Sequence, residues 1–211
     1  MDPLTHALAG QAIADAWFGR RLGSEGARIA ALAALAPDLD LLPAFLAAFP
    51  PKWTGRHLGL IDPGLTRRFH RAYTHSFFFA ALASPLLGYL AWRWSGRRDG
   101  WPAWSLLILL ALYSHILLDL ANPYGVRAWL PFSEERSSWG DRPLFDIPGL
   151  AILATVFGLN HGLRRSPPEP AFLRGRPAAW LDRLAPARAT AVLGLILLAG
   201  RIIAAILWNW P

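Results

Sequence analysis

Long runs of apolar residues constrain this chain more than any other feature of its sequence. Five of them are long enough, or nearly so, to cross the hydrocarbon core of a bilayer, which is about 30 Å thick. These runs cover residues 27–49, 75–92, 102–121, 147–163 and 189–210. A sixth segment, 3–18, is shorter and more polar, and it either spans the bilayer or lies at its surface as a packed helix. We therefore predict an all-α, multi-span bundle with five or six membrane segments.

The composition agrees with that of a membrane protein. Charged residues make up 17% of the chain, against about 25% in a typical soluble domain. The formal net charge is +7, and nearly all the basic residues are arginines in short loops between apolar runs. This placement favours contact with anionic lipid headgroups over nucleic-acid binding. Because the chain has no cysteine, a bound metal must be held by imidazole and carboxylate groups.

The distribution of basic residues indicates an orientation in the membrane. If the five runs cross alternately, twelve basic residues at 20–28, 93–98 and 164–188 fall on one side, and eight at 52–71 and 127–142 fall on the other. The positive-inside rule assigns the first side to the cytoplasm. We treat residues 1–211 as one membrane-embedded domain, in which 164–211 forms a basic loop and the last span.

His115 and Asp119 are the most informative pair of ionisable residues. Ionisable side chains at membrane depth are costly and by default indicate function. A helix places residues four apart on one face, about 5–6 Å apart at Cβ. This geometry suits two ligands of one divalent ion, or one ligand beside the carboxylate that orients it. The alternative is a buried His–Asp hydrogen bond that joins two helices.

Other ionisable groups lie inside the apolar runs or at their ends. Asp38 and Asp40 follow Pro37 within the first long run, where two unpaired carboxylates would be costly. A helix cap explains one of these aspartates readily and two poorly. The remaining groups precede a run or begin it: His6, then His70, Arg71 and His75, and finally Asp146.

Topology predicts that these groups meet. With five spans, the groups at 70–76, 115–119 and 146–148 all emerge on the side that has eight basic residues, and the run that holds Asp38 and Asp40 also exits there. We therefore expect one site at an extracytoplasmic membrane face, without His57 and His161. Two alternatives remain: a metal-ion or proton-coupled transporter, whose site would lie near the midplane within repeats, and a structural protein whose polar network locks helices together.

In their order along the chain, these motifs resemble the membrane-bound metal-dependent hydrolase family, also described as LexA-regulated, inner-membrane-associated hydrolases. The matching motifs are Asp-x-x-Thr-His at 2–6, Pro-Asp-x-Asp at 37–40, His-Arg-x-x-Thr-His-Ser at 70–76, His-x-x-x-Asp at 115–119, Asn-x-Tyr-Gly at 122–125 and Pro-Phe-Ser at 131–133. Ile147 separates Asp146 from Pro148 where the family has an Asp-Pro-like turn, which leaves the role of Asp146 open. The resemblance covers about residues 1–150. The order of ligands is also remotely similar to that of the all-helical, zinc-dependent phospholipase C and nuclease group, which hydrolyses phosphoesters.

The residues and the resemblance together define an expected site. Its metal ligands are His6, Asp38, His70, His75, His115 and Asp119. That is more than one catalytic zinc with an open position requires, so we expect one or two divalent ions, zinc by resemblance, that activate a water molecule.

The remaining site residues are expected to act beside the ligands. Asp40 and Asp146 are expected to be ligands, partners that orient ligands, or the general base. Arg71 is expected to hold a phosphate or carboxylate group of the substrate, or to pair with an acid. The resemblance implies a hydrolase of the bacterial inner membrane, and a site at the membrane surface suggests an amphiphilic substrate such as a phospholipid or another lipid-linked phosphoester. The oligomeric state stays open.

Overall fold

The computed structural model describes residues 1–42, 70–96, 99–140, 143, 145–165 and 179–208. In these residues the chain forms six α-helices and no strand beyond an isolated bridge between Val126 and Ser137, which confirms the all-α prediction. The helices are α1 (Pro3–Ile13), α2 (Gly19–Leu35), α6 (Phe77–Trp94), α7 (Trp101–Leu120), α8 (Ile147–Arg165) and α9 (Ala179–Trp208). A π-helical turn, Ala14–Phe18, joins α1 to α2, and short 3₁₀ turns at Ala36–Leu41 and Tyr73–His75 follow α2 and precede α6.

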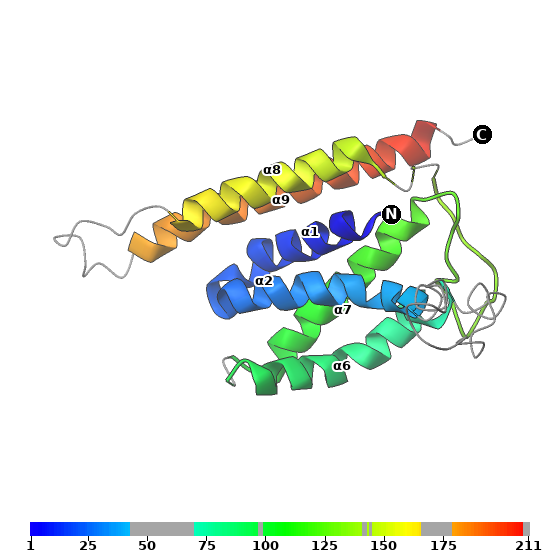
Figure 1. Cartoon of the computed structure of the whole chain (residues 1–211), viewed down its shortest axis with the longest axis horizontal. Coiled ribbons are helices and arrows are strands. Elements are labelled where there is room, and N and C mark those ends of the chain that lie inside the picture. The colour runs from blue at the N-terminus through cyan, green and yellow to red at the C-terminus, as the bar shows by residue number, and fades with distance from the viewer. Residues whose placement is uncertain (43–69, 97–98, 141–142, 144, 166–178, 209–211) are drawn as a thin grey trace, which may run out of the picture.

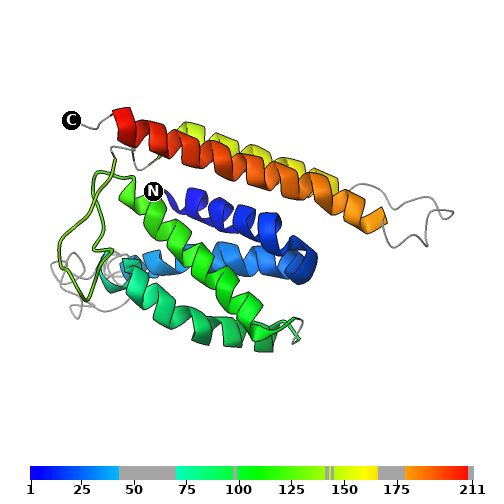
Figure 2. The ribbon, with the colours of Figure 1, turned by 180° about the vertical axis from the view of Figure 1, so that it is seen from behind.

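The helices pack as three antiparallel pairs: α1 with α2, α6 with α7, and α8 with α9 (Figure 1). Helix α7 crosses the other helices obliquely, as the view from behind shows (Figure 2), and it also packs on α1 and α2. Its side chains Trp104, Leu107, Ala111 and Ile116 are fully buried. Helix α7 is therefore the centre of the core, and residues on its buried face are positioned by several neighbours.

Local sequence explains where these helices begin. The Asp2 carboxylate accepts a hydrogen bond of 2.8 Å from the backbone N–H of Thr5, so it caps α1, and Pro3 occupies the first helical position. Gly23 has a φ of 57° inside α2, where the chain leaves helical geometry as it reverses from α1. Pro102 lies in the first turn of α7, a position where its missing N–H has no helical partner to lose.

Each helix pair has a glycine at a point where the two helices are in close contact. A Cβ atom added at Gly10 of α1 would lie 2.5 Å from the carbonyl oxygen of Ala30 in α2. A Cβ added at Gly88 of α6 would overlap the backbone of Ser105 in α7, and one at Gly194 of α9 would overlap the side chain of Val156 in α8. Small residues that let backbones approach closely are typical of helix packing in membranes.

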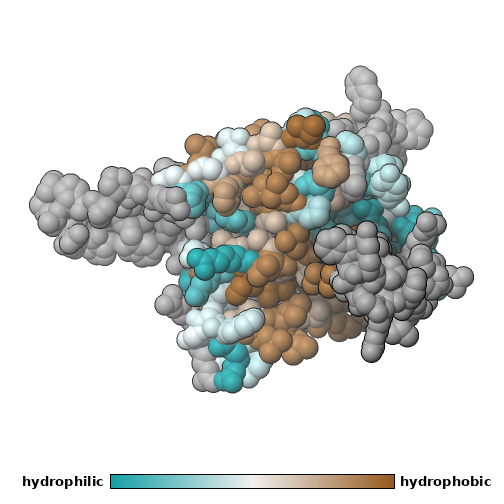
Figure 3. Space-filling model, in the orientation of Figure 1, coloured by the Kyte–Doolittle hydropathy of each residue, from teal (hydrophilic) through white to brown (hydrophobic). Residues whose placement is uncertain are grey.

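The number of membrane spans is not confirmed. Among the described residues, two helical segments are long and apolar enough to cross a bilayer, Trp101–Leu120 and Pro186–Ala204, and Ile147–Gly162 is a shorter apolar helix. Helix α1 has only 11 residues. In the run predicted at 27–49, α2 is followed by the 3₁₀ turn at Ala36–Leu41, and the part beyond residue 42 lies outside the described residues. Apolar side chains nevertheless form a band across the middle of the face in Figure 3, between more hydrophilic ends.

The helix that contains the last candidate span begins earlier than the predicted span. We expected it at 189–210, after a basic loop that begins at residue 164, but α8 continues to Arg165 and α9 already begins at Ala179. Pro186 lies inside α9. The residues between these two helices, 166–178, are outside the described residues.

Replacing Gly88 with alanine tests the close packing of α6 on α7. Because the added methyl would overlap the Ser105 backbone, we expect the free energy of unfolding to fall by about 1–3 kcal/mol. Gly158→Ala in α8 is the matched control, since nothing lies within 4 Å of its new Cβ, and it should be neutral or stabilising by up to about 1 kcal/mol. Thermal unfolding in detergent measures both variants. Equal destabilisation by the two substitutions would contradict the packing account.

Candidate metal centre

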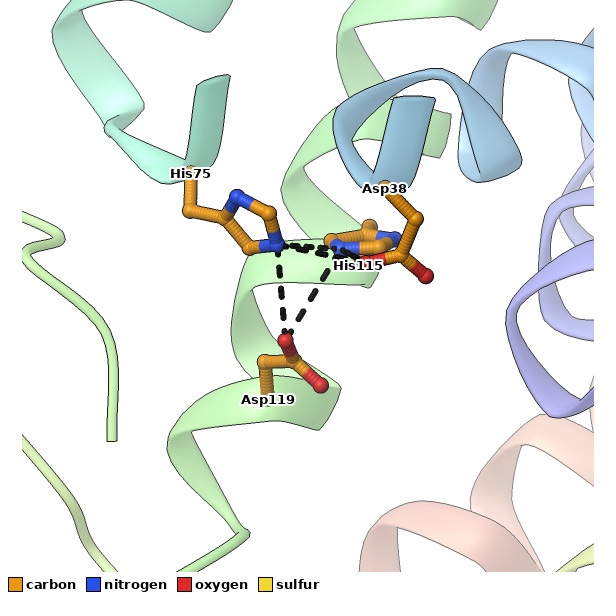
Figure 4. Close-up of side chains that lie close together, drawn as sticks. All are labelled: Asp38, His75, His115 and Asp119. Atoms are coloured by element: carbon orange, nitrogen blue, oxygen red, sulfur yellow. Dashed lines mark hydrogen bonds and ion pairs between the residues drawn. The ribbon is translucent and has the colours of Figure 1, made fainter. Parts of the chain in front are cut away.

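Four side chains that are distant in sequence converge on one point: Asp38, His75, His115 and Asp119 (Figure 4). One ligand atom from each lies within 4.8 Å of the other three. Three of the four side chains are fully buried, namely His75, His115 and Asp119. The fourth, Asp38, has 19% of its side chain exposed. This arrangement places two imidazoles and two carboxylates around a common centre, as the sequence predicted for these four residues.

Three elements supply the four ligands. His115 and Asp119 are four residues apart on the buried face of α7, near its C-terminal end. Asp38 lies in the 3₁₀ turn that ends α2, and His75 ends the 3₁₀ turn before α6. The loop after α7 holds this second turn in place, because the N–H of Phe77 donates to the carbonyl of Ala128 (3.0 Å) and the N–H of Arg127 donates to the carbonyl of Arg71 (3.1 Å).

Hydrogen bonds fix which nitrogen each imidazole presents to the centre. Nδ1 of His115 lies 2.7 Å from the carbonyl oxygen of Ala34. A carbonyl only accepts, so Nδ1 carries the proton and the neutral ring presents the lone pair of Nε2. Thr74 repeats this arrangement at His75: its hydroxyl donates to Asp40 (2.8 Å), which leaves the oxygen to accept from Nδ1 of His75 (2.9 Å). Such outer partners are typical of imidazoles that bind metals.

The separations between ligand atoms match a small coordination shell. Nε2 of His75 lies 3.0 Å from Nε2 of His115, 3.5 Å from Asp38 Oδ1 and 3.6 Å from Asp119 Oδ2. Nε2 of His115 lies 3.7 Å from Asp38 Oδ1 and 3.9 Å from Asp119 Oδ2. Tetrahedral ligands at about 2.0–2.1 Å from a zinc ion would be roughly 3.3–3.4 Å apart. A divalent cation therefore fits among these atoms with small side-chain adjustments.

Buried atoms without hydrogen bonds support a cation site independently of these distances. Among the described residues, Asp119 Oδ2 and both ring nitrogens of His6 are buried and have no hydrogen-bond partner. Buried polar groups almost always have partners, and an unpaired one costs about 1–3 kcal/mol. The lone pairs at Nε2 of His75 and His115 face each other beside the carboxylates of Asp38 and Asp119, and such a group of atoms attracts a cation. The donor set thus fits a divalent metal.

His6 lies beside this centre, in contact with Asp119. Its ring stacks on that of His115 with centroids 3.8 Å apart, and its Nε2 is 3.3 Å from Asp119 Oδ1. Asp119 therefore faces His75 and His115 with one oxygen and His6 with the other, and the amino group of Met1 also contacts Oδ1. Oδ1 of Asp119 is thus already paired with a positive charge, and Oδ2 is the oxygen that faces the centre.

His70 is not among the four clustered ligands, although we predicted it as one. Its Nδ1 instead bonds to Asp40 Oδ1 at 2.8 Å, and its ring meets that of His75 edge-on at 5.7 Å. Asp40 also accepts from the hydroxyl of Thr74 and from the N–H of Arg71. Asp40 therefore bonds to His70 directly and is linked to His75 through the hydroxyl of Thr74. Sequence reasoning missed the contribution of Thr74, because its bridging position depends on the fold.

The carboxylates of Asp38 and Asp40 lie outside the two candidate spans, and both have pKa values below the ordinary value for aspartate. Burial raises the pKa of Asp40, but hydrogen bonds from His70 and Thr74 outweigh it. Burial also raises the pKa of Asp38, and the interaction with His75, followed by electrostatic interactions with His115 and His6, lowers it further than burial raises it. Both groups are ionised at neutral pH, as metal ligation requires.

Asp146 is the predicted site residue that the structure does not bring to the centre. Its carboxylate forms a two-pronged ion pair with Arg201, with distances of 2.7 and 3.1 Å, at the start of α8. The described contacts of Asp146 therefore join α8 to α9. His161 also lies apart, exposed on α8 against Phe157, as expected. His57 is outside the described residues.

A cavity of about 500 Å³ gives access to the centre. Its lining includes Asp38 and His70, together with residues that sequence reasoning did not assign to the site, among them Tyr124 and Arg136. Arg71 also lines it, with Nη2 at 3.5 Å from Asp119 Oδ2. The open side of the centre is thus the side on which Asp38 lies.

Replacing His115 with alanine removes one nitrogen from the centre, and we expect the purified protein to lose most of its bound divalent metal. Elemental analysis by mass spectrometry of the detergent-purified protein measures the metal content. His161→Ala is the matched control, because this histidine is exposed on α8, and it should keep the metal of the unmodified protein. Equal metal content in the two variants would favour a purely structural polar network.

Comparison with known proteins places the chain in a family. The searches of curated proteins and of solved structures gave no match. A family model described as YdjM inner membrane protein matches residues 1–210. The chain belongs to the YdjM inner membrane protein family.

Proposed function

We propose that this protein is a metal-dependent hydrolase whose active site is the centre formed by Asp38, His75, His115 and Asp119. The observation that carries the proposal is the convergence of two imidazole Nε2 atoms, each fixed by a bond at Nδ1, on two carboxylates. A divalent cation bound there lowers the pKa of a coordinated water toward neutrality and polarises the bond to be cleaved. One cation suits these four ligands, and a second one at His6 would have to displace the amino group of Met1 from the other oxygen of Asp119.

The chain itself supplies a proton-transfer group beside this centre. His70 lines the access cavity, is 23% exposed, and is held at Nδ1 by the carboxylate of Asp40. A carboxylate in this position orients an imidazole, and the oriented ring can accept or donate a proton at Nε2. We therefore assign His70 and Asp40 to proton transfer and orientation rather than to metal binding.

An apolar cavity supports an amphiphilic substrate. It has a volume of about 630 Å³ and is lined by apolar side chains of α1, α7 and α9, among them Ile13, Leu110 and Ala199. Helices α7 and α9 contain the two candidate spans, so the occupant with matching chemistry is the acyl chain of a lipid. Leu118 and Leu198 line this apolar cavity. They belong to the same hydrophobic cluster as Met1, and Met1 lines the other cavity, the one beside the metal centre. A lipid can thus place its chain in one cavity and its headgroup in the other.

His70→Ala tests the division of roles. Because His70 lies outside the four ligands, we expect this variant to keep its metal and to lose at least about a hundredfold in kcat on a phosphodiester substrate such as bis-p-nitrophenyl phosphate. The unmodified protein and His161→Ala serve as references, and elemental analysis accompanies the kinetics. A variant that loses its metal would return His70 to the ligand set. Absence of hydrolysis by metal-loaded unmodified protein on every phosphoester and carboxylic ester tried would contradict the enzyme proposal.

Ala199→Phe tests the apolar cavity. The larger side chain would fill part of the space next to α7, so activity on long-chain phospholipids should fall about tenfold or more while activity on short-chain analogues with the same headgroup is retained. Ala204→Phe adds the same group at an exposed position of α9 outside the cavity lining and is the control. An unchanged ratio of long-chain to short-chain activity would show that acyl chains bind elsewhere.

A further inference from the structure

We propose that Arg71 and Arg136 form a binding subsite for a phosphate group beside the metal centre. The inference rests on the proposed hydrolase function and assigns its substrate to phosphate esters. Both arginines line the cavity of about 500 Å³ that also contains Asp38, the one partly exposed ligand. A phosphate held by these arginines therefore lies next to the metal ligands.

The backbone of Arg71 is held in a conformation that side-chain-bearing residues avoid. Its φ is 58°, in the left-handed region. Two hydrogen bonds maintain it: the N–H of Arg71 donates to Asp40 Oδ2 at 3.2 Å, and its carbonyl accepts from the N–H of Arg127 at 3.1 Å. Because Asp40 also holds His70 and Thr74, the direction of the Arg71 side chain is coupled to the orientation of the imidazoles.

The guanidinium of Arg71 has unused hydrogen-bonding capacity. The residue is only 7% exposed, and its Nη1 is buried without a hydrogen-bond partner among the described residues. Nη2 lies 3.5 Å from Asp119 Oδ2, and the guanidinium carbon lies 5.8 Å from the ring centroid of Tyr124, which also lines the cavity. A buried donor with no acceptor is costly, and an anion in the cavity would supply the acceptor.

Arg136 provides a second guanidinium at the same cavity. Backbone carbonyls orient it, with Nη1 at 3.3 Å from the oxygen of Gly125 and Nη2 at 3.4 Å from the oxygen of His70. Within the described part of the chain, no carboxylate forms an ion pair with Arg136, so its charge is available to a ligand. It is exposed, in contrast to Arg71, and thus stands at the rim of the cavity.

The two guanidinium groups select for phosphate over neutral esters. Guanidinium groups bind phosphate through two parallel N–H···O bonds, and a phosphate has enough oxygens to meet two arginines and a cation together. A carboxylic ester or an amide carries no charge to balance the arginines. The phosphate group can belong to a lipid headgroup or to a free phosphate compound, which share this chemistry.

Binding of inorganic phosphate tests the subsite without requiring turnover. We expect metal-loaded protein in detergent to bind phosphate saturably in isothermal titration calorimetry, and Arg71→Gln and Arg136→Gln to bind it about tenfold to a hundredfold more weakly, as loss of a charge-assisted hydrogen bond implies. Arg93→Gln, which removes the same charge at an exposed position in the last turn of α6, should bind as the unmodified protein does. Metal content and Tm are measured for every variant. Arg136→Gln keeps the test decisive if Arg71→Gln fails to fold, because Arg136 is exposed.

Further ligands identify the source of the phosphate and separate the two proposals. Tighter binding of dihexanoyl phosphatidic acid than of inorganic phosphate supports the subsite with a lipid source, and equal binding supports it with a free phosphate compound. Acetate that binds as tightly as phosphate, or equal phosphate affinity in all three arginine variants, overturns the subsite. A further outcome is that Arg71→Gln and Arg136→Gln lose phosphate binding while the metal-loaded unmodified protein hydrolyses no substrate. That result supports the subsite and contradicts the hydrolase proposal.

Discussion

The hydrogen bond from Nδ1 of His115 to the carbonyl oxygen of Ala34 is the interaction on which the candidate site depends. It joins the central helix α7 to the end of α2, and it turns the lone pair of Nε2 toward His75 and the carboxylates of Asp38 and Asp119. Because the three ligands other than Asp38 are fully buried, little water is available to compensate their charges and lone pairs. A cation is the partner that satisfies all of these groups at once.

The fold explains why these groups meet at one end of the bundle. Each of the three helix pairs has a glycine at a close contact, so the two backbones approach closely. Helix ends from each pair lie near the C-terminal end of α7, at one end of the bundle (Figures 1 and 2). The 3₁₀ turns that carry Asp38 and His75 interrupt the helices at this face. At the same end, Asp146 pairs with Arg201 and joins α8 to α9. The site thus lies at helix ends, which fits a hydrolase better than a transporter with its site at the midplane.

Much of this arrangement was predictable from the sequence, and the failures have physical reasons. Helical periodicity placed His115 and Asp119 on one face, and alternation of the apolar runs brought Asp38 and His75 to them. The sequence did not distinguish His70 from His75, because their directions depend on a turn in which Arg71 adopts a positive φ. It did not predict the ion pair of Asp146 with Arg201, because this partner is 55 residues away. It also did not reveal the 3₁₀ turn at Ala36–Leu41, which interrupts the first long run and carries Asp38.

The central claim is that the four side chains bind one cation directly. Anomalous diffraction from crystals of the protein, collected at the absorption edge of the metal it retains, tests this claim most directly. The account predicts a peak about 2.0–2.3 Å from Nε2 of both His75 and His115, with Asp38 and Asp119 as the other protein ligands and a position left open for water. A retained metal located away from these residues, or crystals grown with excess divalent metal that show no peak between them, would contradict it.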